Sequence, residues 1–325
     1  MAVRNPIRPA VRVEILDLRH FTSADLSPLL EEEIEQWGRF LAWDYRSSAE
    51  MILRYVDAKI LPGYAAVERG SLAGYAFFVY EGSKGVIGDL FVAPSRPDVR
   101  AVELSLIEHV LETLQQSPGV HRVEAQLLAH NTGDLAGPFI ANGFHGHRRL
   151  FLSLDLAVQG PPRPRRTSSQ ISIRRWAEAD YPPSAGIITA SYRAHIDSEI
   201  NDQYCTSAGS LRFLNNIVRF PGCGVFDPDA SFVAVHEATN ALVGLILCSR
   251  VRGDVGHVTQ VCLLPEYRGE GLGESLLAHT CSALRSRKFG LLTLTVTEAN
   301  HRAVDLYRKL KFDTRRVFDA FVWEG

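Results

Sequence analysis

The sequence contains no apolar run of about 18 residues, which is the length that a helix needs to cross a bilayer. Its N-terminal stretch carries Arg4, Arg8 and Arg12, which do not fit a signal-peptide pattern. No charge of one sign dominates, because 35 Lys and Arg against 37 Asp and Glu leave a formal net charge of −2. We therefore expect a cytoplasmic protein that binds neither a membrane nor nucleic acid.

Cysteine is scarce and unpatterned, with five residues in 325 and no Cys-x-x-Cys pair. Such a set predicts neither a disulfide framework nor a metal site, and we expect small buried side chains in a reducing compartment. Cys262 lies in the middle of an expected strand with no base beside it in sequence, which argues against a nucleophile. The full set is Cys205, Cys223, Cys248, Cys262 and Cys281.

A cluster of three glycines stands between an expected strand at 257–264 and an expected helix at 274–284. Gly269, Gly271 and Gly273 occupy alternate positions, so no Cβ keeps a ligand from the backbone. Their N–H groups lead into a helix start, which attracts anions. The spacing is neither that of a Rossmann fingerprint nor that of a P-loop, and a flexible turn explains most such clusters. The pattern alone thus indicates a phosphate cradle only weakly.

The residues around these glycines strengthen the prediction of a phosphate-binding loop. Arg268, Gly271 and Gly273 follow a strand and Pro265, and this run resembles the acetyl-CoA-binding motif of the GNAT superfamily of N-acetyltransferases. A second stretch, after an expected strand at 291–297, resembles the family motif Asn-x-x-Ala-x-x-Leu-Tyr-x-x-x-Gly-Phe. It reads Asn300, Ala303, Leu306, Tyr307 and Phe312, with Lys311 in place of the glycine. Because lysine tolerates a left-handed conformation poorly, we expect that turn to differ.

The chain repeats its order of elements, which predicts an internal duplication. Pro94 corresponds to Pro265, and the stretch 139–144 corresponds to 307–312. The resemblance then implies an α/β (α+β) fold of two tandem GNAT-like domains. Each would have a mixed, mostly antiparallel twisted sheet with helices on both faces and a splayed central pair of parallel strands. We expect domains at 1–156 and 171–325, joined by a Pro- and Arg-containing linker at 157–170.

The first copy is expected to lack a cofactor site. Where the second half has glycines, the first has Pro97 and Asp98, which remove a donor and add a negative charge. Where the second half has Tyr307, the first has Phe139, which has no proton to give. We therefore interpret 1–156 as a degenerate copy.

The resemblance implies transfer of an acetyl group from acetyl-CoA to a primary amine by direct attack in a ternary complex, with no metal. It places the pantetheine arm between the strands 257–264 and 291–297, and an N–H of the first strand at the developing oxyanion. The acceptor would be a small-molecule amine or a peptide N-terminus. The cofactor-binding residues implied are Val261, Cys262, Leu263, Arg268, Gly269, Glu270, Gly271, Leu272, Gly273, Glu274, Asn300 and Tyr307.

Two residues are predicted to carry the proton transfers. Tyr307 is the candidate acid, since a phenol stays protonated at neutral pH and can protonate the leaving thiolate. The alternative is a tyrosine packed in the core. His257 stands where many members of the family place a glutamate, so it is the candidate base, although a lone histidine at a strand start is more often structural. Asn300 equally fits a helix N-cap.

The acceptor side is less well specified. Asp197, Glu199 and Asp202 either bind a cationic amine or form a solvated acidic face, and Tyr204 belongs to the same region. Two other functions stay open: a CoA-binding sensor or scaffold without turnover, and an acyltransferase that uses a longer acyl-CoA or an aminoacyl donor. Monomer and homodimer are both compatible with the sequence.

Overall fold

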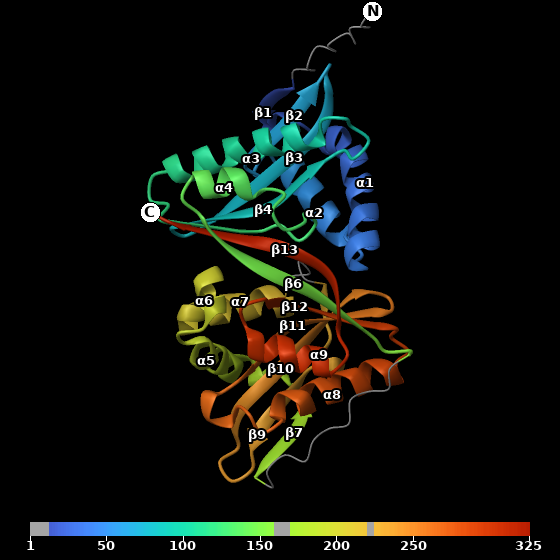
Figure 1. Ribbon diagram of the computed structural model, residues 1–325, viewed down its shortest axis with the longest axis vertical. Coiled ribbons are helices and arrows are strands. Elements are labelled where there is room, and N and C mark those ends of the chain that lie inside the picture. The colour runs from blue at the N-terminus through green and yellow to red at the C-terminus, as the bar shows by residue number, and fades with distance from the viewer. Residues whose placement is uncertain (1–12, 159–169, 220–223) are drawn as a thin grey trace, which may run out of the picture. The chain divides into compact units, whose positions relative to one another are not determined.

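The computed structural model describes residues 13–158, 170–219 and 224–325 (Figure 1). Its contacts divide the chain into two compact units. One contains the residues up to Glu33, Glu50–Ala125 and the last two residues; the other contains Ile34–Ala49 and Gln126–Trp323. The second unit therefore includes segments from the first half of the sequence. Most of the predicted linker, 159–169, lies outside the described residues, and the predicted domain boundary stays a prediction.

The first unit is a five-stranded sheet in the order β1-β2-β3-β4-β5. The neighbours are antiparallel except for β4 and β5, which are parallel. The β2–β3 turn is tight because Arg69 and Gly70 both have positive φ, at 49° and 82°. The elements that lie wholly or partly in this unit are β1 (Glu14–Asp17), α1 (Ser23–Leu41), α2 (Arg46–Asp57), β2 (Gly63–Glu68), β3 (Ser71–Glu81), β4 (Lys84–Val92), α3 (Val99–Gln116) and β5 (Arg122–Gln126). The end of α1 from Ile34, the start of α2 up to Ala49 and Gln126 of β5 belong to the second unit.

The second unit has the strand order β13-β6-β12-β11-β10-β9-β7, with the short β8 beside β10. Here β11 and β12 are parallel and the other pairs given are antiparallel. Its elements before the glycine loop are α4 (Ala136–Ala141), β6 (His145–Asp155), β7 (Ile171–Arg175), α5 (Tyr181–Tyr192), α6 (Ile196–Ile200), α7 (Ser207–Arg219), β8 (Val225–Phe226), β9 (Phe232–His236), β10 (Ala241–Arg252) and β11 (Val255–Leu263). After the loop come α8 (Leu272–Ser286), β12 (Leu291–Thr297), α9 (His301–Lys309) and β13 (Asp313–Glu324).

Helices cover both faces of this second sheet, because its central strands are apolar on both sides. Along β10, Leu245 and Leu247 pack in a cluster with the helices α5 and α7. Ile246 and Cys248 point the other way, into a cluster with α8 and α9. The alternation of period two along one strand thus builds two cores.

The parallel pair separates halfway along its length. β11 and β12 are paired only from Val255 with Leu291 to Val258 with Leu294. Immediately afterwards β11 carries a bulge at Thr259, where its register with β10 shifts by one residue. Beyond this point no ladder joins the two strands, although β11 continues to Leu263. The split leaves a gap in the middle of the sheet.

The predicted fold class is confirmed, including the mixed sheets and the parallel central strands. Two short elements were not predicted, α6 and β8. The expected change at Lys311 is wrong: this residue takes the left-handed conformation at φ 68°, and Phe312 N–H still closes on the Tyr307 carbonyl at 2.9 Å. Gly143 and Phe144 make the same turn in the first copy. None of the helices described is long and apolar enough to cross a membrane.

Candidate active site

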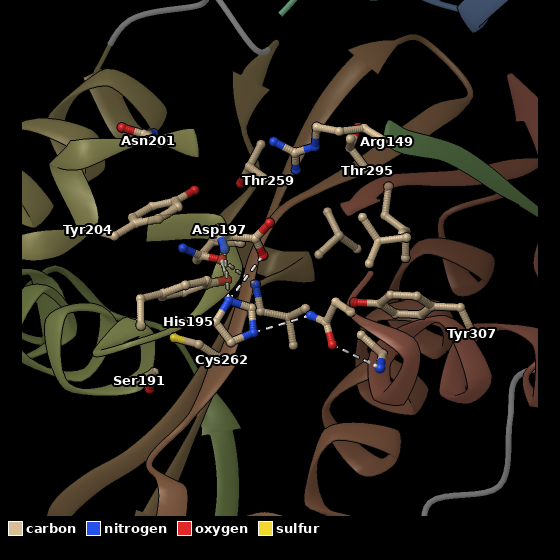
Figure 2. Close-up of a pocket in the computed structure, with 18 of the residues that line it drawn as sticks. Arg149, Ser191, His195, Asp197, Asn201, Tyr204, Thr259, Cys262, Thr295 and Tyr307 are labelled. Atoms are coloured by element: carbon tan, nitrogen blue, oxygen red, sulfur yellow. Dashed lines mark hydrogen bonds and ion pairs between the residues drawn. The ribbon is translucent and has the colours of Figure 1, made fainter. Parts of the chain in front are cut away.

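A cavity of about 400 Å³ lies in the second unit, at the point where β11 and β12 separate. Its walls come from both strands, from α5 and the following turn into α6, from α9, and from β6 (Figure 2). Among the predicted residues, seven line it: His257, Val261, Cys262, Leu263, Arg268, Asn300 and Tyr307. The structure thus brings Arg268 of the first motif to the same cavity as Asn300 and Tyr307 of the second, about 30 residues later in sequence. The other predicted cofactor-binding residues do not line the cavity: Gly269, Glu270, Gly271, Leu272, Gly273 and Glu274.

The glycine loop runs from Arg268 to the start of α8. Gly269 and Gly271 have φ of 96° and 86°, and Gly271 is the N-cap of the helix. Gly273 has an ordinary conformation, and a Cβ there would meet only Leu263 and Leu306 at van der Waals distance. Within the described residues, no backbone hydrogen bond from the amides of Gly269, Glu270 or Gly271 is found, and the Ser275 N–H donates to the Gly271 carbonyl at 3.0 Å. The loop therefore presents unpaired donors at a positive helix end.

The Arg268 side chain holds this loop in place. Its Nε donates to the Leu263 carbonyl at 3.1 Å, and its Nη2 donates to the Ser191 carbonyl at 2.5 Å. The guanidinium thus ties the loop to the end of β11 and to α5. Glu274, in the first turn of α8, has its carboxylate 2.7 Å from the Lys309 ammonium. This ion pair lowers the repulsion that an acidic side chain would otherwise exert on an anion.

Tyr307 lies on α9 and is 6% exposed, with its ring edge-on to Phe312. Figure 2 shows its hydroxyl directed towards the cavity. Burial raises its pKa above the ordinary value, and the negative charge of Asp197 adds to that effect. The phenol therefore keeps its proton throughout the neutral range.

His257 lines the cavity but is enclosed. It is 6% exposed, its ring stacks on Phe151 and meets the edge of Trp43, and its Nδ1 lies 2.9 Å from the Thr293 hydroxyl. Burial lowers its pKa from 6.5 to about 3. Because protonation is so unfavourable here, the environment disfavours the role of a base that sequence predicted for it.

A second histidine, His195, also lines the cavity, and the sequence did not single it out. The His195 Nδ1 is 3.1 Å from the Asp197 N–H and 3.5 Å from its carboxylate, and Nε2 is 3.3 Å from the Asn300 amide nitrogen. Thr297 donates its hydroxyl to the Asp197 carboxylate. The Asp197 side chain is 13% exposed, so it is no solvated acidic residue. His195, Asp197 and Asn300 thus form a connected polar cluster on the cavity wall, and Figure 2 shows His195 beside Asp197.

Asn300 serves as the N-cap of α9, with its Oδ1 accepting from the Ala303 N–H at 3.2 Å. This bond leaves the amide nitrogen as the group that faces His195. Arg302, one residue into the same helix, also lines the cavity, and its Nη2 lies 3.2 Å from the place where a Cβ on Gly269 would stand. The family motif does not include Arg302, and its only signal in the sequence was a basic residue two positions after the Asn300 cap.

On β11, next to the gap between the two strands, the Gln260 side chain has a nitrogen without a hydrogen-bond partner in the described structure. Gln260 accepts through Oε1 from the Tyr192 hydroxyl at 2.8 Å and from the Val261 N–H at 3.0 Å. Its Nε2 is buried and has no hydrogen-bond partner within the described structure. Acetyl-CoA offers amide and thioester carbonyls to such a donor and phosphates to the glycine loop, so the residues present fit this co-substrate. Cys262 is buried, and burial raises its pKa to about 12, which leaves the thiol protonated.

The cavity also contains residues from the first half of the sequence: Trp43, Gln126, Leu128 and Arg149. Arg149 comes from β6, which lies between β12 and β13. The predicted acceptor region is represented by Asp197 and Tyr204, whereas Glu199 and Asp202 do not line the cavity. The described residues contain no group of three metal-ligating side chains. Of the four cysteines with described surroundings, three are buried, as expected, and Cys205 is exposed; Cys223 lies outside the described residues.

Comparison with known proteins agrees with this geometry. Residues 191–312 match the model of the acetyltransferase (GNAT) family. Mycothiol acetyltransferase of Thermobifida fusca is 35% identical over 97 residues, which is 27% of this chain and 30% of that protein. The glucosamine 6-phosphate N-acetyltransferase of Trypanosoma brucei brucei is 33% identical over 86 residues, or 25% and 56% of the two chains. The chain thus spans about a third of the length of the mycothiol enzyme that it matches.

Solved structures cover nearly the whole chain. A GCN5-related N-acetyltransferase from Sphaerobacter thermophilus superposes with a TM-score of 0.67 over 96% of this chain and 95% of the other, at 16% identity. A tandem GNAT protein from the clavulanic acid biosynthesis pathway gives 0.60 over 96% and 98%, at 17% identity. These likenesses show that the chain has the fold of these two proteins over nearly its whole length. The match to the acetyltransferase (GNAT) family model covers residues 191–312 of it.

Proposed function

We propose that this protein is an acetyl-CoA-dependent N-acetyltransferase whose active site is the cavity of the second unit, in the sequence region 171–325. The observation that carries the proposal is that Arg268, where the glycine loop begins, and Tyr307 both line the cavity at the split between β11 and β12. Acetyl-CoA, when bound, supplies an acetyl thioester to this site.

The glycine loop and the two strands would hold the co-substrate. The amides of the residues from Gly269 to Glu274 bind its diphosphate, and Arg302 adds a positive charge at the same end. Val261, Cys262 and Leu263 contact the pantetheine arm along β11, and Asn300 contacts it from α9. The Val261 N–H now donates to the Gln260 side chain, so it is the candidate donor to the thioester oxygen once that side chain turns.

Tyr307 would donate the proton that the leaving thiolate needs. Its hydroxyl faces the cavity, and burial keeps it protonated at neutral pH. Its ring also packs on Phe312, which holds the Tyr307 side chain in place on α9. The role therefore combines proton donation with positioning.

For the base we favour His195 over His257. A neutral histidine that takes a proton from the attacking amine becomes positively charged. The carboxylate of Asp197 lies 3.5 Å from the His195 ring and stabilises such a charge, whereas His257 is surrounded by Trp43, Phe151 and Thr293. Asp197 thus acts as a positioning residue, itself fixed by Thr297.

The acceptor class is a primary amine, either a small molecule or a peptide N-terminus. Relatives carry names of both kinds: the glucosamine 6-phosphate enzyme, and a putative ribosomal protein bS18-alanine N-acetyltransferase of Bacillus subtilis that is 36% identical over 56 residues. The cavity volume of about 400 Å³ accommodates a small acceptor.

The test measures release of free CoA from acetyl-CoA over a panel of small amines and short peptides. The full-length protein should release CoA with at least one of these acceptors and more slowly from longer acyl-CoA species. Binding of acetyl-CoA without release for any acceptor would support a sensor instead. Equal or faster turnover of a longer chain would show a different acyl donor.

The base is tested by the kcat/KM of two variants. His195→Gln should lower kcat/KM about 100-fold or more. His257→Gln is the matched control, with the same substitution at the other histidine of the cavity, and it should lower kcat/KM much less. If His257→Gln causes the large loss and His195→Gln does not, the assignment is reversed.

A further inference from the structure

Arg149 is a cation of the cavity wall that lacks an anionic partner. Its side chain lies between Thr259 and Thr295 in Figure 2. Within the described structure its guanidinium makes one hydrogen bond, from Nη1 to the Gln126 carboxamide oxygen at 2.8 Å. Its Nε is shielded from solvent and has no partner there, and no carboxylate of the described residues forms an ion pair with it.

Two more-exposed arginines of this unit are neutralised by carboxylates, whereas the half-buried Arg268 and Arg316 donate to carbonyl oxygens. Arg287 donates to Asp227 at 2.6 Å and 2.8 Å, and Arg174 donates to Asp180 at 2.7 Å through two nitrogens. A guanidinium removed from water needs such compensation. Gln126 positions Arg149 without cancelling its charge, since a carboxamide is neutral. The charge is therefore left for a ligand.

The position of Arg149 separates it from the glycine loop. It stands on β6 opposite Thr297 of β12, two residues from Phe151, which stacks on His257. Thr297 in turn bonds Asp197. Arg149 thus belongs to the side of the cavity that holds His195 and Asp197, whereas Arg268 and Arg302 adjoin the loop.

We infer that the amine acceptor carries an anionic group, a carboxylate or a phosphate, which Arg149 binds while the amine lies at His195 and Asp197. A planar guanidinium pairs with either anion through two hydrogen bonds. The inference rests on the proposed function. It gives the first half of the sequence a part in acceptor choice through Arg149 and Gln126.

The experiment uses matched acceptors on the full-length protein: glucosamine 6-phosphate against glucosamine, and alanine against alaninamide. At least one anionic member should have a kcat/KM about 10-fold or more above its neutral partner, since a charge-assisted pair is worth that much. A preference within the glucosamine pair identifies the bound group as a phosphate, and a preference within the alanine pair identifies it as a carboxylate. Equal values in both pairs would overturn the inference.

Two variants and one control locate the effect. Arg149→Gln should abolish the preference by raising KM for the anionic member, and Gln126→Glu should do the same by neutralising Arg149 internally. Arg148→Gln is the control, because Arg148 is adjacent, 54% exposed and near Glu298, and it should leave the preference unchanged. A preference that survives both Arg149→Gln and Gln126→Glu contradicts the assignment. Where Arg149→Gln fails to fold, Gln126→Glu decides.

A binding measurement distinguishes failure of the proposed function from failure of the anion-site inference. If no acceptor is acetylated, binding of the anionic members to the acetyl-CoA complex is measured by calorimetry. Binding that Arg149→Gln weakens about 10-fold supports the anion site without the reaction, and the absence of binding removes both.

Discussion

The two histidines of the cavity differ in what surrounds them. His257 is enclosed by Trp43, Phe151 and Thr293, and burial lowers its pKa to about 3. His195 adjoins the carboxylate of Asp197. Residue type and position along the sequence favoured His257, because its place in a strand matches the family pattern. Its enclosure depends on Trp43, which is more than 200 residues earlier in the chain.

Replacing Tyr307 by phenylalanine tests the acid. Tyr307→Phe keeps the ring that packs on Phe312 and removes the proton. We expect kcat to fall about 100-fold, while the Kd for CoA stays within about 2-fold. Steady-state rates and isothermal titration calorimetry measure the two quantities. An unchanged kcat would exclude the phenol as the acid.

The buried His257 makes stability depend on pH. Its pKa is lowered from 6.5 to about 3, so below pH 6.5 the unfolded chain binds a proton that the folded one excludes. The free energy of unfolding should therefore decrease as pH falls from 6.5 towards 3, by at most about 1.4 kcal/mol per pH unit from this group. Urea denaturation at pH 7 and pH 5 measures it.

The matched variant is His257→Gln, which has no such proton to exclude. Its loss of stability between pH 7 and pH 5 should be about 2 kcal/mol smaller than that of the natural protein. Identical losses in both proteins would show that His257 is not kept neutral by burial.

At the scale of elements, the glycine loop and the helix that follows it act as one unit. Gly271 is both the N-cap of α8 and a residue with φ of 86°, so its conformation directs the helix start towards the cavity end of β11. The glycine spacing made this loop predictable. The Arg268 contacts with Leu263 and Ser191 were not predictable, since they depend on how α5 packs against β11.

Gly271→Ala should weaken CoA binding at least 10-fold, because a Cβ disfavours the left-handed conformation by about 1–2 kcal/mol and shifts the amides. Gly273→Ala is the matched control in the same loop, with ordinary φ and room for a Cβ. It should bind CoA normally. The Kd for CoA is measured by calorimetry for the natural protein and both variants. Equal weakening by both substitutions would contradict the explanation from the left-handed conformation of Gly271.

Lys311 ends α9 in a left-handed conformation that glycine adopts more easily. Lys311→Gly should raise the free energy of unfolding by about 0.5–1 kcal/mol, since the exposed side chain makes no packing contribution and the Cβ strain is relieved. Lys311→Ala keeps the Cβ and should give no such gain. Denaturation midpoints measure both, and a loss of stability in Lys311→Gly would refute the argument.

For the molecule as a whole, the tandem arrangement predicts one co-substrate per chain. The loop before α3 carries Pro97 and Asp98, and Asp98 bonds Arg96 at 3.1 Å. A negative side chain and a missing N–H at a helix start disfavour a diphosphate. Calorimetry with CoA should therefore give a stoichiometry of one.

The variant Gly271→Ala identifies which copy is involved. If Gly271→Ala weakens all of the CoA binding that calorimetry detects in the natural protein, the site lies in the second copy, as proposed. A stoichiometry of two, or one strong site that Gly271→Ala leaves unchanged, would show a functional first copy.

The sequence by itself predicted the two motifs and the repeated order of elements, because these depend on local patterns, and the family resemblance of the motifs implied the fold class. Alternating apolar residues set the strands, glycine spacing set the loop, and the Asn300–Tyr307 spacing set one helical face. The strand 291–297 and the helix that follows were predicted almost to the residue.

Only the tertiary structure decided the composition of the cavity wall. His195, Arg149, Trp43 and Arg302 reach it from segments without a motif, and β6 inserts a strand of the first half between β12 and β13. It also decided the environment of His257, since burial and the distance between charges depend on all packed neighbours and not on the order of residues.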